Sequence, residues 1–164
     1  MFQILTKYNT EAIEANNMVI VAAVDESDRA ASILEEADNL AEKFGDTIDV
    51  LHVMKRSEAI QLEEDSANPD EVVSIDELRN RASRTAAEVI ESHPTNASSE
   101  SVGRIGDPAT EIVDYAEDHD VRYIVVSPKK QSATGKMLFG SVAQSILLNA
   151  SCPVVSLVAQ NSEA

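Results

Sequence analysis

The loop from Lys129 to Lys136 and the glycine–serine pair that follows it form the segment best suited to binding an anion. Three of the chain's lysines lie in this loop: Lys129, Lys130 and Lys136. Gly140 and Ser141 then open a predicted helix, where unpaired backbone N–H groups and the helix dipole favour negative charge. In an otherwise strongly acidic chain, this local reversal of charge indicates a phosphate site.

The same segment also has a purely structural interpretation. Ser141 and Gln144 have the S-x-x-Q spacing of a capping box, so the serine is expected to cap the helix with or without a ligand. The lysines can then be solvated side chains of an exposed loop. The sequence leaves both interpretations open.

The usual signatures of an enzyme are absent from the sequence. Gly135-Lys136 is followed by Met137, so there is no nucleoside-triphosphate P-loop, and no glycine-rich turn follows the first predicted strand. The three histidines lack metal-ligand spacing. Cys152, the only cysteine, is expected to be a buried structural thiol. No catalytic residue and no metal ligand is therefore predicted.

The charge of the chain limits its partners and its setting. There are 29 acidic and 13 basic residues, a net charge of −16, which opposes binding to nucleic acid or to an anionic membrane. Such self-repulsion destabilises a compact state unless salt screens it, which favours a high-salt cytoplasm. The alternative is that the protein works in a cytoplasm of ordinary salt concentration and simply has an acidic surface. Residues 1–16 lack the pattern of a secretion signal, so a cytoplasmic location is expected.

Apolar patterns predict alternating strands and helices. Strands are expected at 17–24, 47–54, 99–105, 123–126 and 153–158, the third at a sheet edge, and helices at 30–44, 78–93, 108–116 and 141–148. Residues 55–73 lack periodicity and are expected to form an irregular surface connection, with a partial helix left open. This order predicts an α/β fold with a parallel sheet, helices on both faces and a ligand site beyond the carboxyl ends of the strands.

Several short motifs resemble the universal stress protein family. They are Asp25 after the first strand, Leu51-His52-Val53, Gly106-Asp107-Pro108, Gly140-Ser141 at the end of the hallmark G-x2-G-x9-G-[ST], and Cys152-Pro153-Val154-Val155. The segment S-A-T-G-K-M-L-F-G-S-V is similar in sequence to that of family members from salt-loving archaea. By this resemblance the chain is identified as a haloarchaeal-type member. Ser127 and Lys130 stand where the hallmark has its first two glycines.

The resemblance implies a doubly wound five-stranded parallel sheet, strand order 3-2-1-4-5, of the adenine-nucleotide alpha hydrolase-like type. It implies ATP or a related adenine nucleotide between the first and fourth strands, accompanied by Mg²⁺, with at most slow hydrolysis. Asp25 would contact the nucleoside and the Val53 backbone the adenine. The phosphates would be held by Ser127, Lys129, Lys130, Gly140, Ser141 and Val142. Asp25 also has a plainer possible role, flanking or capping the first helix.

The resemblance further implies a stress-response module spanning residues 17–160, with an N-terminal extension at 1–16 and a tail at 161–164. A homodimer is expected through the last strand, Val154 to Val158, whose exposed edge can pair with a second copy. The alternative function is a family member without nucleotide that acts through protein contacts alone.

Overall fold

Twelve helices and strands make up the part of the chain that the computed structural model describes, residues 17–66, 68, 72–128, 130–131 and 137–157. The strands are β1 (Val19–Ala23), β2 (Thr47–Met54), β3 (Ser99–Ile105), β4 (Val121–Val126), β5 (Lys130–Gln131), β6 (Met137–Leu138) and β7 (Val154–Ser156). The helices are α2 (Arg29–Phe44), α3 (Arg56–Glu64), α4 (Ile75–Ser92), α5 (Pro108–Asp118) and α6 (Ser141–Asn149). The predicted extension at 1–16 and tail at 161–164 lie outside the described residues.

Five strands form one parallel sheet in the order β3-β2-β1-β4-β7, with β1 in the centre and β3 at one edge. Because β5 and β6 form a separate small sheet, this is the predicted order 3-2-1-4-5, and the fold prediction is confirmed. The two-stranded β5–β6 sheet is antiparallel, and it lies where the sequence predicted only a loop.

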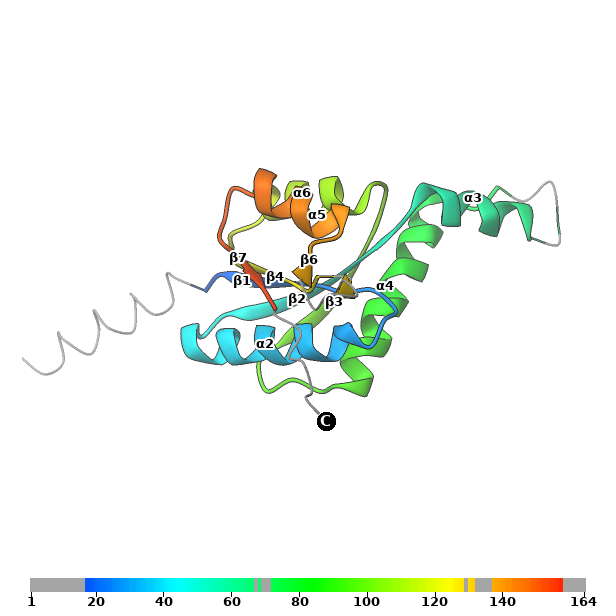
Figure 1. Cartoon of the computed structure of the whole chain (residues 1–164). Coiled ribbons are helices and arrows are strands. Elements are labelled where there is room, and N and C mark those ends of the chain that lie inside the picture. Colours follow the sequence, from blue (N-terminus) through cyan, green and yellow to red (C-terminus); the bar gives the residue numbers. More distant parts are fainter. Residues whose placement is uncertain (1–16, 67, 69–71, 129, 132–136, 158–164) are drawn as a thin grey trace, which may run out of the picture.

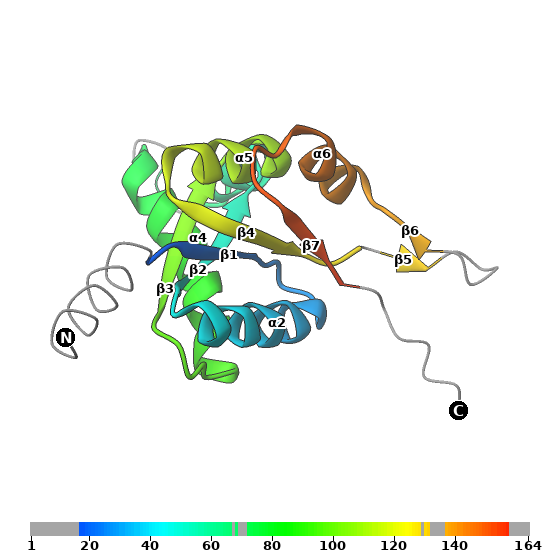
Figure 2. The same cartoon turned by 90° about the vertical axis from the view of Figure 1, so that its left-hand side faces the viewer.

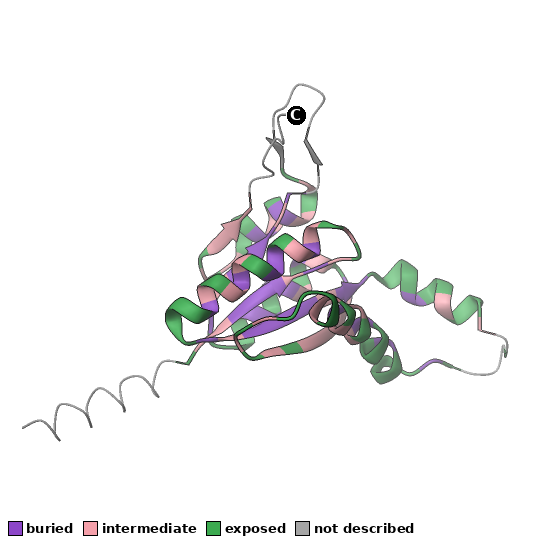
Figure 3. Ribbon diagram, turned by 90° about the horizontal axis from the view of Figure 1, so that it is seen from below, coloured by how far each residue is buried: buried purple, intermediate pink, exposed green. Residues whose placement is uncertain are grey.

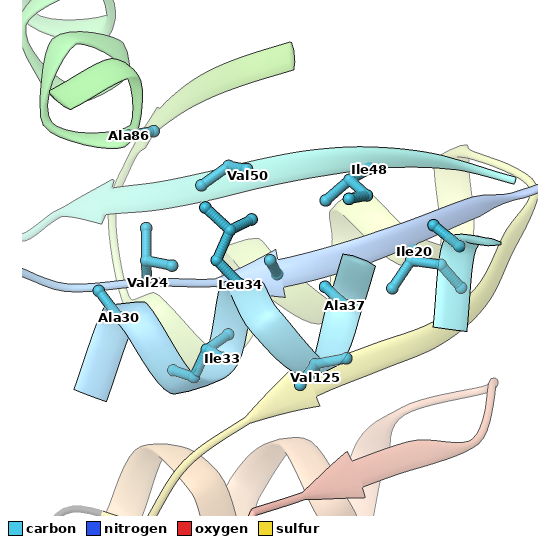
Figure 4. Close-up of a cluster of buried hydrophobic side chains, with 12 residues drawn as sticks. Ile20, Val24, Ala30, Ile33, Leu34, Ala37, Ile48, Val50, Ala86 and Val125 are labelled. Carbon is cyan, nitrogen blue, oxygen red and sulfur yellow. The ribbon is translucent and has the colours of Figure 1, made fainter. Parts of the chain in front are cut away.

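Helices cover both faces of the sheet, as Figures 1 and 2 show: α2 and α4 lie on one face, α5 and α6 on the other. Figure 4 shows the first core, where Leu34 and Ala37 of α2 pack on Ile20 and Val50 of the central strands. A second core lies under α5 and α6 and includes Ile124. Figure 3 shows that burial is concentrated in the sheet and in the helix faces toward it.

Local signals fix most of the helix ends. Gly45 ends α2 with a φ of 70°, a left-handed conformation that glycine adopts without strain. Asp107 caps α5, accepting the Thr110 N–H at 3.0 Å, as predicted. The expected cap at Ser141 is wrong: Gly140 is the N-cap of α6, without a side-chain hydrogen bond, and Ser141 is already helical.

The connection after β2 differs from the expected irregular surface segment because it contains α3. Ala59 is the only buried residue of this helix, and Leu62 is partly buried beside it. Figure 1 shows α3 standing out from the body of the domain beyond β2 and α4. None of the described helices is both long enough and apolar enough to span a bilayer.

Candidate functional site

A cleft with a volume of about 840 Å³ lies at the carboxyl ends of β1, β2 and β4. Six of the predicted site residues line it: Asp25, Val53, Ser127, Gly140, Ser141 and Val142. Lys129 is outside the described residues, as is the side chain of Lys130, whose backbone belongs to β5. The segments on either side of the lysine-rich loop therefore meet Asp25 in one cleft.

The topology of the sheet explains why these residues meet. The central strand β1 pairs with β2 on one side and with β4 on the other, all parallel, so their carboxyl ends lie at the same edge. The chain leaves β1 for α2 on one face, whereas it reaches β4 from α5 on the opposite face. Diverging connections of this kind leave a crevice outside the sheet at the point where the winding reverses.

Asp25 braces the short loop that joins β1 to α2. Its Oδ1 accepts the Ser27 N–H at 3.0 Å and also the Ser27 hydroxyl, and its Oδ2 accepts Nη2 of Arg29 at 2.6 Å. Arg29 Nε in turn donates to Ser27 Oγ at 2.9 Å. Asp25 therefore has the flanking role that the sequence allowed, but the N-cap of α2 is Asp28. Bracing the loop also fixes a carboxylate and a guanidinium at the wall of the cleft.

The amino end of α6 forms the opposite wall. Ser141, Val142 and Ala143 line the cleft, and the first helical hydrogen bond is donated by Gln144 to the carbonyl oxygen of Gly140, at 3.0 Å. The N–H groups of the first helical turn have no acceptor within their own helix, and Gly140 has no side chain with which to cap them. This end of the cleft thus offers hydrogen-bond donors and the positive end of a helix dipole.

The end of β2 forms the third wall. Val53 is buried and packs in the core under α5. His52 lines the cleft and its Nδ1 lies 3.1 Å from the carbonyl oxygen of Val24. Because a carbonyl oxygen only accepts, Nδ1 carries the proton and Nε2 is left as an acceptor in the neutral ring.

Sequence reasoning missed two further parts of the wall. Arg29 was not singled out, although its spacing of four residues from Asp25 is a recognisable signal for an ion pair. Glu58, Gln61 and Asp65 also line the cleft. They belong to the segment expected to be irregular, and nothing in the sequence indicated that it contributes to the cleft.

The clearest pKa shifts among the described residues lie outside the cleft. Burial and a hydrogen bond to Asp49 raise the pKa of Tyr115, and burial raises that of Cys152, as expected for a structural thiol. A side-chain hydrogen bond to Asp46 raises the pKa of Arg122. The described residues hold no cluster of three His, Cys, Asp or Glu side chains suited to a metal ion.

The sequence model of the Universal stress protein family matches residues 16–157, almost the whole of the described chain. The chain belongs to this family. A relative within it, universal stress protein YxiE of Bacillus subtilis, is 29% identical over 147 residues, which cover 85% of this chain and 97% of the relative.

Solved structures of universal stress proteins share the fold. One from Archaeoglobus fulgidus is 27% identical with a TM-score of 0.59, covering 87% of this chain and 99% of its own. A structure from the same organism in complex with dAMP is 24% identical with a TM-score of 0.54, covering 87% and 98%. Two others, one holding cAMP and one from Arabidopsis thaliana holding AMP, are each 15% identical, with TM-scores of 0.60 and 0.55.

Proposed function

We propose that this universal stress protein binds ATP or a related adenine nucleotide in the cleft and serves as a stress-response regulator. The observation that carries the proposal is the composition of the cleft wall. Donor N–H groups of α6, the braced Asp25 and the end of β2 face one space at the switch point of the sheet. Family membership supports it, as do the structures of the same fold that hold dAMP, cAMP or AMP.

The strand order suggests how the ligand is oriented. Phosphates belong at the α6 end, because its N–H groups favour anions, and the nucleoside extends past Asp25 toward Val53. Ser127 is half-buried at the cleft wall, so replacing the hallmark glycine there adds only a small side chain. Lys129 and Lys130 come soon after Ser127 in the chain. Their charges would compensate for the close contact between backbone and phosphate that the second hallmark glycine would allow.

We propose that Mg²⁺ accompanies the nucleotide and would be held mainly by its phosphates. Asp25 is a candidate protein ligand, because it lines the same cleft. A single carboxylate plus substrate phosphates is a common arrangement for this ion. The chain's own residues would bind and orient the nucleotide, and hydrolysis would be slow because no general base has been identified.

Calorimetric titration with ATP in molar KCl tests the proposal. Wild type should bind, and Asp25→Ala should bind about tenfold more weakly, because a charged acceptor beside the sugar is lost. Asp28→Ala is the matched control: Asp28 is exposed, makes no capping hydrogen bond and does not line the cleft. Circular dichroism shows whether both variants remain folded.

A wild-type chain that gives no heat with ATP, and carries no nucleotide through purification, would favour the alternative. That alternative is a family member acting through protein contacts alone. The departures at Ser127 and Lys130 favour it, whereas the six predicted residues gathered around one cleft favour binding.

We also propose a homodimer formed through β7. This strand pairs with β4 on one side and lies at the end of the five-stranded sheet, so its other edge is available to a second copy. On the adjacent α6, Leu147 and Leu148 are 41% and 76% exposed. Val158, the end of the predicted contact strand, lies outside the described residues.

A further inference from the structure

The cleft does not end at β2 but continues along one face of α3. Glu58, Gln61, Leu62 and Asp65 all line it. Their spacing of three, four and seven residues from Glu58 places them on one side of the helix. Ala59 and Leu62 anchor this side by packing with Met54 and Leu78. The helix therefore presents to the cleft a polar stripe, formed by Glu58, Gln61 and Asp65, with the apolar side chain of Leu62 beside it.

This stripe follows β2, whereas the donor groups of α6 belong to a helix that packs with α5 and β7. From β4 through β1 to β2 the strand ends are spaced by about 4.8 Å each, so the α3 side lies roughly 10 Å from the Ser127 side. The walls there are Val53, Met54 and Leu62, which are buried or partly buried, together with the polar atoms of α3. An elongated ligand with its phosphates at α6 would place a flat, partly apolar group against this wall.

We propose that Gln61 selects the base of the nucleotide that the cleft binds, an inference that rests on the function proposed above. On the N7 edge of adenine, a carboxamide donates its N–H₂ to N7 and accepts the 6-amino group with its oxygen, as a bidentate pair. Glu58 and Asp65 add carboxylates, which only accept. Oxygens of this kind favour an amino group at position 6 of the purine and repel a carbonyl.

Glu58 is less available than Gln61 for a contact with the base. Its Oε2 lies 3.3 Å from the Lys55 N–H, which it accepts at the first turn of α3. Asp65 is the C-cap residue of the helix, at the far end of the stripe. Gln61 lies between them in the middle of the helix, and it is the side chain of the stripe that offers a donor as well as an acceptor.

ATP has an amino group at position 6 of the purine, whereas ITP has a carbonyl there and a proton on N1; N7 is an acceptor in both, so the ratio of their affinities measures the proposed contact at position 6. In calorimetric titrations in molar KCl, wild type should prefer ATP. Gln61→Ala should weaken ATP binding about tenfold and leave ITP binding nearly unchanged, so that the ratio of the two affinities falls about tenfold. Ile60→Ala is the control, because Ile60 is 54% exposed on the same helix and does not line the cleft. It should keep the wild-type ratio.

The outcomes separate this inference from the function it rests on. A wild type that binds neither nucleotide overturns both. A wild type that binds ATP, with a Gln61→Ala variant that keeps the wild-type ATP-to-ITP ratio, overturns the role of Gln61 alone. Equal losses of ATP and ITP in Gln61→Ala also overturn it, because they indicate a general disturbance of α3 rather than a contact with the base.

Discussion

Two carboxylates lie inside the domain among the residues that the structure describes, and each has a specific partner. The Asp46 side chain is fully buried and accepts Arg122 Nε at 2.5 Å and the Met18 N–H at 3.0 Å. Asp49, at the start of β2, accepts the Tyr115 hydroxyl at 2.6 Å. An unpaired buried charge is strongly unfavourable, so these partners are what allow the two acids to be inside.

We predict that Tyr115→Phe destabilises the domain and changes its response to alkali. The substitution leaves the buried Asp49 carboxylate without its donor, a loss of about 1.5–3 kcal/mol at neutral pH. Folding raises the pKa of Tyr115 because burial and Asp49 both disfavour the phenolate. A raised pKa stabilises the folded state fully below the unfolded value of about 10 and progressively less above it.

Urea unfolding at pH values from 8 to 11 measures this effect. The free energy of unfolding of wild type should fall more steeply above pH 10 than that of Tyr115→Phe, which has no hydroxyl to ionise. Tyr123→Phe is the control, because Tyr123 is only partly buried and has no bond to Asp49. Equal slopes for wild type and Tyr115→Phe would show that another group causes the alkaline loss.

At the scale of elements, the sequence predicts those whose apolar residues face a core. α2 and α4 were predicted because small and aliphatic residues recur on one side, and Ala37, Ala82 and Ala86 are indeed completely buried. Phe44, the last residue of α2, continues the apolar spacing of the helix but is 45% exposed. It packs on Tyr123 and under Arg122 at the rim.

The sequence left a partial helix open at 55–73 but did not predict α3 outright, for a physical reason. Periodicity shows a helix only where one face is apolar, and α3 buries Ala59 alone while its cleft side is polar. The residues of the candidate site likewise fall into those that the sequence predicts and those that it does not. Asp25 and Ser127 were predictable because each follows a parallel strand, and parallel strands end at one edge. Gln61 was not, since its place depends on the packing of Ala59 and Leu62 with Met54 and Leu78, which is a tertiary contact.

The contact of α4 with β3 depends on a glycine. A Cβ at Gly103 would lie 2.1 Å from the Arg79 carbonyl oxygen and 2.4 Å from the Ser83 nitrogen, both in the backbone of α4. The backbone of α4 cannot move aside as a flexible side chain can, so Gly103→Ala should push α4 away from β3. We expect a loss of about 3 kcal/mol in the free energy of unfolding, measured by thermal or urea denaturation.

Gly45→Ala separates this steric effect from the loss of a glycine as such. Gly45 has a φ of 70°, but a Cβ there would have no atom within 4 Å. The expected loss is only the strain of a left-handed alanine, about 1–2 kcal/mol. If Gly103→Ala and Gly45→Ala were equally stable, the close approach of the α4 backbone to Gly103 would not determine the cost of adding a Cβ there.

At the scale of the whole molecule, the proposed dimer can be tested without disturbing the core. Val155 and Leu157, obvious targets in the last strand, pack against the α2 core, so a charge there would also damage the fold. Leu148 is 76% exposed beside β7. We expect Leu148→Glu to shift the wild-type dimer toward monomer in light scattering, with unchanged circular dichroism.

Val72→Glu is the control for added charge, since Val72 is 88% exposed, on the connection before α4 and away from β7. It should remain dimeric. A wild-type chain that is monomeric over a wide concentration range contradicts the dimer, and a Leu148→Glu variant that stays fully dimeric places the contact elsewhere.

The net charge of −16 predicts that salt stabilises the entire domain. Repulsion among surface carboxylates is screened as the Debye length falls from about 30 Å at 0.01 M to about 3 Å at 1 M salt. The ion pair of the buried Asp46 with the partly exposed Arg122 is screened less than pairs of exposed charges, so the gain should come mainly from the surface. We expect the melting temperature to rise by about 5–10 °C between these concentrations of KCl, which corresponds to a few kcal/mol.

The shape of the response distinguishes screening from the general stabilisation that excluded solutes produce. Screening changes most at low ionic strength and then levels off, because the Debye length is already about 10 Å at 0.1 M. Sucrose, which acts by exclusion and carries no charge, should give a steady rise without the early steep phase. A melting temperature indifferent to KCl would show that the acidic surface does not limit stability, and the high-salt setting would lose its physical basis.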